Sequence, residues 1–338
     1  MIDFAYSDEQ LQIVTAVAAT LSRTAAVADP QPRPMNAGST HLEVEKLGAL
    51  GWIGVALPEA CGGSGSTLIE EALIAREYGR WLASPDVIAT TIAAALALQA
   101  NDPAGARRYV EGQWSAAFGV PMAPAAGRVD QSYIVAQADA VTHYVLFTDC
   151  AMRVVRAAQT LEFRPCIDPQ MKTALIPAAS VEFPYDAPGA VDELSCRVLI
   201  MLAAMLAGLS EASRDLAVEH AKTRKQFGRV IGAFQAIKHH CADMHVRARM
   251  AYSQAMHAAM LLAAREMNAP QQALAAFETA SSAAIKNAEV GIQIHGAMGF
   301  SAECPAHRYL KRAHVLRIIG GGAMALQPTL AHALRGPA

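Results

Sequence analysis

The sequence predicts a mostly α-helical protein with one small β segment between two helical parts. Helical patterns with capping signals fill the first third of the chain, and a stretch of alternating, β-branched residues follows. After residue 196 come four long helical stretches of 28–33 residues with short connections, which are typical of an antiparallel bundle. We therefore expect an N-terminal helical domain over 1–112, a reduced β domain over 113–195 and a four-helix bundle over 196–338.

Capping signals mark the helices of the first third. A serine or threonine followed three residues later by a glutamate or glutamine can close both ends of a capping box. Three pairs have this spacing: Ser7 with Gln10, Thr40 with Glu43, and Thr67 with Glu70. Ser84-Pro85 opens a fourth, alanine-rich helix, and the turn-dense segment GWIGVALPEACGGSG separates the second helix from the third.

The middle of the chain favours short strands. SYIVAQADAVTHYVLFTD alternates polar and apolar residues, and MKTALIPAASVEF does likewise, with prolines interrupting the runs. About 80 residues are available, which limits this part to a small sheet.

The four helical stretches are expected at about 196–223, 234–266, 270–297 and 303–335. The most apolar run, VLIMLAAMLAGL at 198–209, has 12 residues. A membrane span needs about 20, so this run predicts a buried core helix and no membrane span.

Composition excludes several classes of protein. The 338 residues are 53% apolar and 17% charged, with a formal net charge of −2. No long basic run is present, so a nucleic-acid partner is not expected. The acidic start MIDFAYSDEQ lacks the order of a signal peptide, and the six scattered cysteines form no CxxC pair. These features predict a cytoplasmic protein without a zinc site or a disulfide frame.

The segment TRKQFGRVIGAFQ, 223–235, is the strongest candidate for ligand binding. It gathers Arg224, Lys225 and Arg229 at a turn between two long helices, and Gln235 follows 11 residues after Arg224. A guanidinium beside an amide suits a pyrophosphate and its neighbouring hydroxyls. A solvated basic turn at a helix C-terminus is the alternative, because the helix dipole favours cations there.

The segment QIHGAMGFSAECP, 293–305, is a second candidate. Gly296 and Gly299 would let a ligand approach the backbone closely, although a glycine C-cap followed by a loop explains the same pattern. Near the chain end, LRIIGGGAMALQ holds three consecutive glycines but neither a GxGxxG nor a GxxxxGK pattern, which argues against a phosphate cradle.

Taken together and in order, these segments resemble the acyl-CoA dehydrogenase family. RKQFGRVIGAFQ is followed by QIHGAMGF and then by RYLKRAHVLRIIGG, and GWIGVALPEACGGSG is similar to a segment of that family's N-terminal helical domain. The resemblance covers roughly 1–100 and 196–335. It implies the three-part fold expected above, the cofactor FAD, and removal of two hydrogens from the α and β carbons of an acyl-CoA thioester.

The resemblance also implies which residues would hold the cofactor. The C-terminal part of one subunit would bind the adenosine diphosphate part of FAD for its neighbour, with Arg224 on the pyrophosphate. The implied cofactor-binding residues are Arg224, Phe227, Gln235, Gln293, Ile294, His295, Gly296 and Ala297. Ala297 departs from the family pattern, which usually has a glycine there.

The catalytic base of the family is missing from both of its usual places. The positions that would carry the glutamate are Gly320 and Val198, and neither side chain can accept a proton. We therefore assign no catalytic residue and expect the three glycines to form a tight loop near the cofactor. The turn and strand that cover the flavin ring have no clear match either, because PMAPAAGR, 121–128, lacks the hydrogen-bonding residues.

The chain has the residues implied to bind the cofactor but lacks the base, and this combination predicts a hetero-oligomer. By the resemblance, a second acyl-CoA dehydrogenase-like subunit would supply the base and most of the acyl-CoA groove, in an assembly of two plus two chains. Some members built this way act on steroid side-chain CoA thioesters, and electrons would pass to an electron-transfer acceptor. The alternatives are a self-sufficient homomeric flavoenzyme with a displaced base such as Glu193, and a flavin-free scaffold or CoA-binding protein.

Two further patterns favour packing over chemistry. His239, His240 and His245 lack an acidic ligand at a useful offset, so no metal site is expected. Glu211 and Asp215 are expected to pair with Arg214 or Lys222 on the solvated face of their helix.

Overall fold

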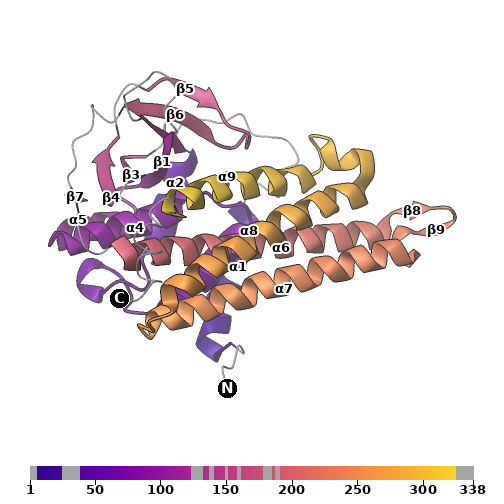
Figure 1. Ribbon diagram of the computed structural model, residues 1–338, viewed down its shortest axis with the longest axis horizontal. Helices are drawn as coiled ribbons and strands as arrows, with labels where there is room; N and C mark the ends of the chain where they lie inside the picture. The colour runs from indigo at the N-terminus through magenta and orange to yellow at the C-terminus, as the bar shows by residue number, and fades with distance from the viewer. Residues whose placement is uncertain are drawn as a thin grey trace, which may run out of the picture.

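The computed structural model describes residues 6–24, 39–122, 132–136, 141–148, 151–157, 161–177, 185–186 and 191–324. Helices come first, a small sheet follows, and four long helices complete the chain, as the sequence predicts. Figure 1 shows the sheet packed over α9, with the long helices running side by side beneath it.

The first part consists of five helices. They are α1 (Asp8–Thr24), α2 (Ser39–Ala49), α3 (Leu68–Arg80), α4 (Asp86–Gln99) and α5 (Pro103–Val110). Two of the expected capping boxes are confirmed: Ser7 and Gln10 exchange backbone-to-side-chain hydrogen bonds, and Thr67 and Glu70 do the same. The side chains of Thr40 and Glu43 lie outside the described residues.

The sheet of the described residues has seven short strands, β1 to β7. Their bounds are Ala116–Met122, Ser132–Ala136, His143–Phe147, Met152–Arg156, Phe163–Pro165, Lys172–Pro177 and Tyr185–Asp186. The order across the sheet is β5-β6-β2-β1-β3-β4-β7, and β1 and β3 are parallel. Successive residues of β1 face opposite sides: Phe118 joins the main core, where α4 and α9 pack on the sheet, and Ala117 joins a separate apolar cluster.

The bundle consists of α6 (Val191–Thr223), α7 (Gln235–Ala263), α8 (Ala269–His295) and α9 (Ala306–Met324). The expected helices are confirmed, with α6 beginning five residues earlier than predicted. The division of the chain into domains at 112 and 195 stays a prediction.

Helix α6 is the central helix of the molecule and packs against α3, α7, α8 and α9. The apolar run 198–209 is buried along its whole length. Among the described residues, the segment Glu193–Thr223 is long and apolar enough to cross a membrane, but 89% of its most apolar window is buried inside the molecule. A core helix accounts for this burial, as the sequence predicts.

The three glycines do not form a loop, so that expectation is wrong. Gly320, Gly321 and Gly322 all lie inside α9. A Cβ added to Gly320 would lie 2.0 Å from Cζ of Phe277 on α8. Gly320 is therefore a packing residue, because it lets the ring of Phe277 lie against the backbone of α9.

Candidate functional site

A two-stranded hairpin joins α6 to α7 at one end of the bundle (Figure 1). Its strands are β8 (Lys225–Gln226) and β9 (Arg229–Val230), and Gln226 pairs with Arg229. The two residues of the turn, Phe227 and Gly228, have φ of +52° and +77°. Positive φ at both positions defines a type I′ turn, which matches the twist of a tight hairpin. Phe227 adopts this backbone against its preference and leaves its ring 90% exposed.

The hairpin carries cations beside the first turn of α7. The side chains of Arg224, Lys225 and Arg229 are exposed. The backbone N–H of Ile231 donates to the carbonyl of Arg224 at 2.8 Å and closes the base of the hairpin. The guanidinium carbon of Arg229 lies 4.2 Å from the centroid of the Phe234 ring, and Gln235 follows as the exposed first residue of α7.

The last turn of α8 supplies the second predicted segment. Gln293, Gly296 and Ala297 are exposed, and His295 is half-buried. Gly296 has φ of +65°, and a Cβ added there would have no atom within 4 Å, so its conformation, and not its size, requires glycine. The side chain of Ile294 is buried, 6% exposed, which leaves its backbone as the part that could meet a ligand.

Apolar packing and one aromatic contact bring the two segments together. Ile294 of α8 packs in a small cluster with Ala217 and Ala221 of α6 and Met244 of α7. The ring of His295 stacks on the ring of His220, with centroids 4.2 Å apart and planes at 25°. The structure therefore gathers the predicted residues at one end of the bundle, around a histidine that no sequence motif singled out.

This end of the bundle fits the adenosine diphosphate part of FAD. Arg224 and Lys225 offer exposed cations for a pyrophosphate. The backbone N–H groups in the first turn of α7 favour a bound anion, because they have no partner within the helix. Arg224 has no ion-pair partner among the residues described, so its charge is available to a ligand. Burial first, and then His295 and Arg224, lower the pKa of His220, as expected where positive charge already gathers.

The two family positions for the base are filled by packing residues. Val198 is fully buried in the core, and Gly320 faces the ring of Phe277. Glu193, the candidate for a displaced base, is exposed in the first turns of α6, so its side chain lies on a different face from Val198. Most of PMAPAAGR lies outside the described residues, which end in this region at Met122.

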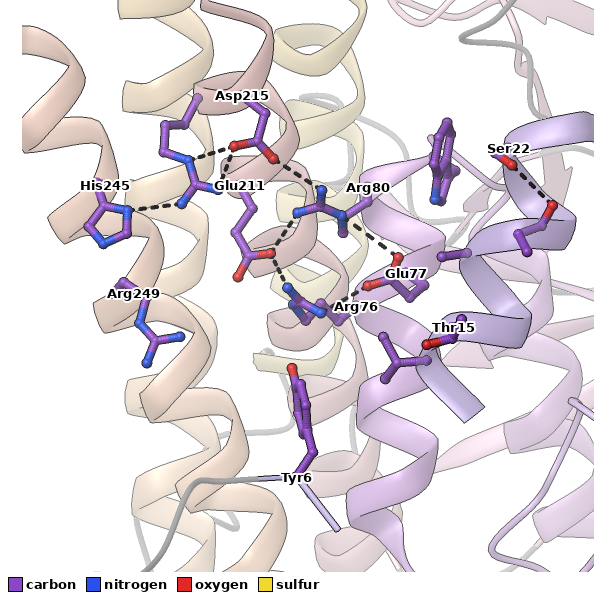
Figure 2. A pocket seen from close by; sticks show the side chains of 15 residues that line it. Tyr6, Thr15, Ser22, Arg76, Glu77, Arg80, Glu211, Asp215, His245 and Arg249 are labelled. Carbon is purple, nitrogen blue, oxygen red and sulfur yellow. Dashed lines mark hydrogen bonds and ion pairs between the residues drawn. The ribbon is translucent and has the colours of Figure 1, made fainter. Parts of the chain in front are cut away.

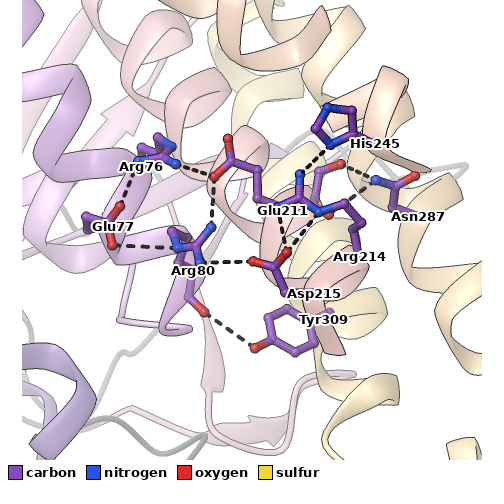
Figure 3. Close-up of polar contacts among 10 residues, drawn as sticks. Arg76, Glu77, Arg80, Glu211, Arg214, Asp215, His245, Asn287 and Tyr309 are labelled. Atoms are coloured by element: carbon purple, nitrogen blue, oxygen red, sulfur yellow. Dashed lines mark hydrogen bonds and ion pairs between the residues drawn. The ribbon is translucent and has the colours of Figure 1, made fainter. Parts of the chain in front are cut away.

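A groove of about 810 Å³ lies elsewhere, between α1, α3, α6 and α7 (Figure 2). None of the predicted cofactor residues lines it. Its floor is an ion-pair network in which Arg76 and Arg80 of α3 bind Glu211 of α6, and Arg80 also reaches Asp215 (Figure 3).

This network corrects the expected pairing of Glu211. Glu211 is 4% exposed and pairs with two arginines more than 130 residues earlier, whereas Lys222 pairs with Glu219. The expected pair of Asp215 with Arg214 is present. Burial raises the pKa of the neighbouring Glu77, and Arg76 and Arg80 oppose that rise. The carboxylates of the groove are thus paired with arginines of the same chain.

No group of three or more histidine, cysteine, aspartate or glutamate side chains that could hold a metal ion occurs in the described part of the chain. His239 and His240 are exposed on α7, and Nδ1 of His245 lies 3.1 Å from a guanidinium nitrogen of Arg214.

Comparison with known proteins agrees with the fold. Residues 7–112 match the acyl-CoA dehydrogenase N-terminal domain, and residues 199–332 match the acyl-CoA dehydrogenase C-terminal domain. The latter range contains both segments of the candidate site.

Two relatives from Mycobacterium tuberculosis and one solved structure are similar over most of this chain. The acyl-CoA dehydrogenase IpdE2 is 32% identical over 81% of this chain and 79% of its own length. The acyl-CoA dehydrogenase FadE34 is 34% identical over 82% of this chain, which corresponds to 40% of FadE34. One chain in the crystal structure of the ChsE4-ChsE5 complex from the same organism superposes on this chain with a TM-score of 0.76 at 19% identity. The superposition covers 100% of this chain and 100% of the matched chain. The chain belongs to the acyl-CoA dehydrogenase family, whose members are FAD-containing oxidoreductases that act on acyl-CoA thioesters.

Proposed function

We propose that this chain is one subunit of a heteromeric FAD-dependent acyl-CoA dehydrogenase. It contributes the half-site for the adenosine diphosphate part of FAD, and a second acyl-CoA dehydrogenase-like subunit contributes the carboxylate base. The resulting reaction is α,β-dehydrogenation of an acyl-CoA thioester. A steroid side-chain thioester is the first substrate class to test, on the resemblance to two-chain members of the family.

One contrast between two parts of the bundle carries this proposal. At the hairpin end, Arg224 is exposed and unpaired among the described residues, next to the exposed Gln235 and Gln293. At the positions of the base, Val198 is 0% exposed and Gly320 is pressed against Phe277, so no carboxylate can occupy either place without repacking the core. The hairpin end thus has side chains that can bind an anion, whereas the two positions expected for the base have no side chain that can take a proton.

Exposed apolar side chains support a partner at the same end of the molecule. Phe227 of the hairpin is 90% exposed, and Met298 and Phe300, just after α8, are 55% and 74% exposed. Large exposed apolar groups that gather near a binding site are typical of an interaction surface. A partner subunit together with its bound cofactor would cover them.

Two of the relatives support a second subunit. This chain matches 40% of FadE34, so that protein has room for a second unit of the same size. The solved structure that contains ChsE4 and ChsE5 is a complex, and one of its chains has this fold.

The chemistry requires both halves of the site. When bound, FAD accepts the hydride that leaves the β-carbon of the thioester, while a carboxylate takes the α-proton. This chain would hold the far end of the cofactor by charge and by backbone contacts, and the partner's carboxylate would receive the proton.

The first test is the FAD content per chain after size-exclusion chromatography. It should be measured for the chain alone and for the chain co-expressed with an acyl-CoA dehydrogenase-like partner encoded nearby. The proposal expects a colourless lone chain and about one flavin per two chains in the pair. A lone chain that holds one flavin and oxidises an acyl-CoA would favour the homomeric alternative, with Glu193 as the first residue to replace.

The second test removes the proposed pyrophosphate contact. Arg224→Ala in the pair should weaken FAD binding by about 10- to 100-fold, because a hydrogen bond to a charged group contributes roughly 1.5–3 kcal/mol. Lys286→Ala is the matched control, since Lys286 is an exposed cation of α8 that pairs with Glu289. Equal FAD affinity in the Arg224 variant and the control would contradict the half-site and favour the scaffold alternative.

A further inference from the structure

His220 is the residue that physically links the two predicted segments. It lies one helical turn before Arg224 on α6, and the backbone N–H of Arg224 donates to its carbonyl at 2.9 Å. Its ring stacks on His295 of α8 at 4.2 Å between centroids. Arg224 is the first residue after α6, and its backbone N–H bond to His220 extends the helical hydrogen-bond pattern by one residue, so the two residues lie together at this end of the helix. A ligand bound by Arg224 would therefore lie close to the stacked rings of His220 and His295.

One tautomer of His295 follows from its hydrogen bond. Nδ1 of His295 lies 2.7 Å from the carbonyl oxygen of Gly291, and a carbonyl can only accept. Nδ1 therefore carries hydrogen, and in the neutral ring Nε2 has the free lone pair.

The charges around the stack oppose protonation in the free chain. Arg224 follows directly after α6, His295 faces from α8, and Cys241 of α7 lies in the adjoining apolar cluster. The preceding residue, Glu219, is exposed and bonded to Lys222 at 2.7 Å. Burial, His295 and Arg224 each lower the pKa of His220. No carboxylate among the described residues contacts the two rings. A ligand anion would therefore be the negative charge that stabilises a protonated ring.

We propose that His220 is a further positioning residue of this half-site, and that its imidazole, stacked on the ring of His295, takes up a proton from solvent when a pyrophosphate binds beside Arg224. The inference rests on the proposed function and adds to it a link between cofactor binding and pH. A bound dianion reverses the sign of the local charge and stabilises an imidazolium. One imidazolium on a neutral ring is tolerated in a stack, whereas two adjacent imidazoliums repel each other, so the uptake is limited to one proton.

The probe for this proposal is ADP-ribose, a pyrophosphate diester that does not titrate between pH 5.5 and 8. Its binding to the full chain is measured by calorimetry across that range, in buffers of different ionisation enthalpy. The wild-type chain should bind about tenfold more tightly at pH 5.5 than at pH 8, which corresponds to a pKa raised by about one unit on binding. At the pH midway between the free and bound pKa values of His220, about half a proton should be taken up per ADP-ribose, which is the maximum for a shift of about one unit.

His220→Phe is the decisive variant, because it keeps a stacked ring on His295 and removes a titrating group. Its affinity should change less than twofold over the same range, and its proton uptake should be lost. His257→Phe is the matched control, since His257 lies on α7 about 33 Å along the axis from Gln235. It should keep the wild-type pH profile.

The outcomes separate this inference from the proposed function. Binding of ADP-ribose with a constant Kd, or an unchanged pH profile in His220→Phe, would overturn the role of the stacked pair and leave the half-site standing. Absence of ADP-ribose binding at every pH would overturn both.

Discussion

At the scale of single residues, the two positions where the resemblance would place the catalytic base are packing positions. Val198 and Gly320 are not exposed gaps where a glutamate has been lost, because both are surrounded by core atoms. Restoring a carboxylate at either place would bury a charge without a partner, which costs several kcal/mol. The packing of α6 and α9 therefore disfavours a carboxylate at either position, which is consistent with the proposed two-subunit site.

His143 offers a test of buried charge at the residue scale. It is 5% exposed between Tyr109 and Trp114, and burial first, then Arg156, lower its pKa from 6.5 to about 4. Between these pH values the unfolded chain binds the proton and the folded chain does not. The free energy of unfolding therefore falls as the pH drops from about 6.5 to 4, by on the order of 3 kcal/mol from this group.

The measurement for His143 is urea unfolding at pH 7, 6, 5 and 4, compared with His143→Phe. Phenylalanine preserves the aromatic contacts, and Thr142 keeps its hydrogen bonds to the backbone of Ser115. The variant should lose about 3 kcal/mol less stability than the wild type over this range. Parallel pH profiles for the two proteins would show that His143 binds its proton as readily in the folded chain as in the unfolded chain.

The sequence predicts single residues well when their role is local. The boxes at Ser7 and Thr67 depend on contacts three residues apart and are confirmed. Glu211 and His220 depend on partners 131–135 and 75 residues away, in α3 and α8, and no local pattern signals such contacts. The predicted cofactor residues come together because the resemblance supplied long-range information that periodicity lacks.

At the scale of elements, the four bundle helices are predicted to within a few residues at most ends, because long apolar periodicity is a strong signal. The expected loop at Gly320, Gly321 and Gly322 is the exception. Three glycines favour a loop by propensity, yet the helix continues through them because α8 presents Phe277 where a Cβ would lie. Tertiary packing overrides local propensity here.

The crossing of α3 and α6 depends on glycine in a different way. A Cβ on Gly208 would lie 1.9 Å from the carbonyl oxygen of Arg76, and one on Gly79 would lie 1.7 Å from that of Met205. Gly208→Ala must therefore push two backbones apart. We expect a loss of about 1–3 kcal/mol in the free energy of unfolding, even though alanine favours a helix by about 1 kcal/mol.

Gly321→Ala on α9 is the matched control for this prediction. A Cβ there has no atom within 4 Å, so only the helix propensity changes and stability should rise slightly. Chemical denaturation of both variants measures the difference. A stabilised Gly208→Ala would mean that the two helices do not cross as closely as this.

At the scale of the whole molecule, one buried arginine connects the three parts of the chain. Arg312 of α9 is 2% exposed and bonds Asp168, in the turn between β5 and β6, at 2.6 Å. It also donates to the carbonyl of Leu82, between α3 and α4, at 3.0 Å. Arg312 of the bundle therefore binds the sheet region by an ion pair and the N-terminal helical part by a hydrogen bond.

Removing this arginine should be more damaging than removing the whole ion pair. Arg312→Met leaves Asp168 buried at 2% exposure without its partner, and such losses typically cost about 3–5 kcal/mol. The double variant Arg312→Met/Asp168→Leu removes both charges and should recover most of that loss. Arg317→Met, an exposed position on the same helix, should change stability by less than about 0.5 kcal/mol. Urea unfolding of the wild type and the three variants measures these differences. An Arg312→Met variant within about 1 kcal/mol of the wild type would show that the three parts are held together by apolar packing without this ion pair.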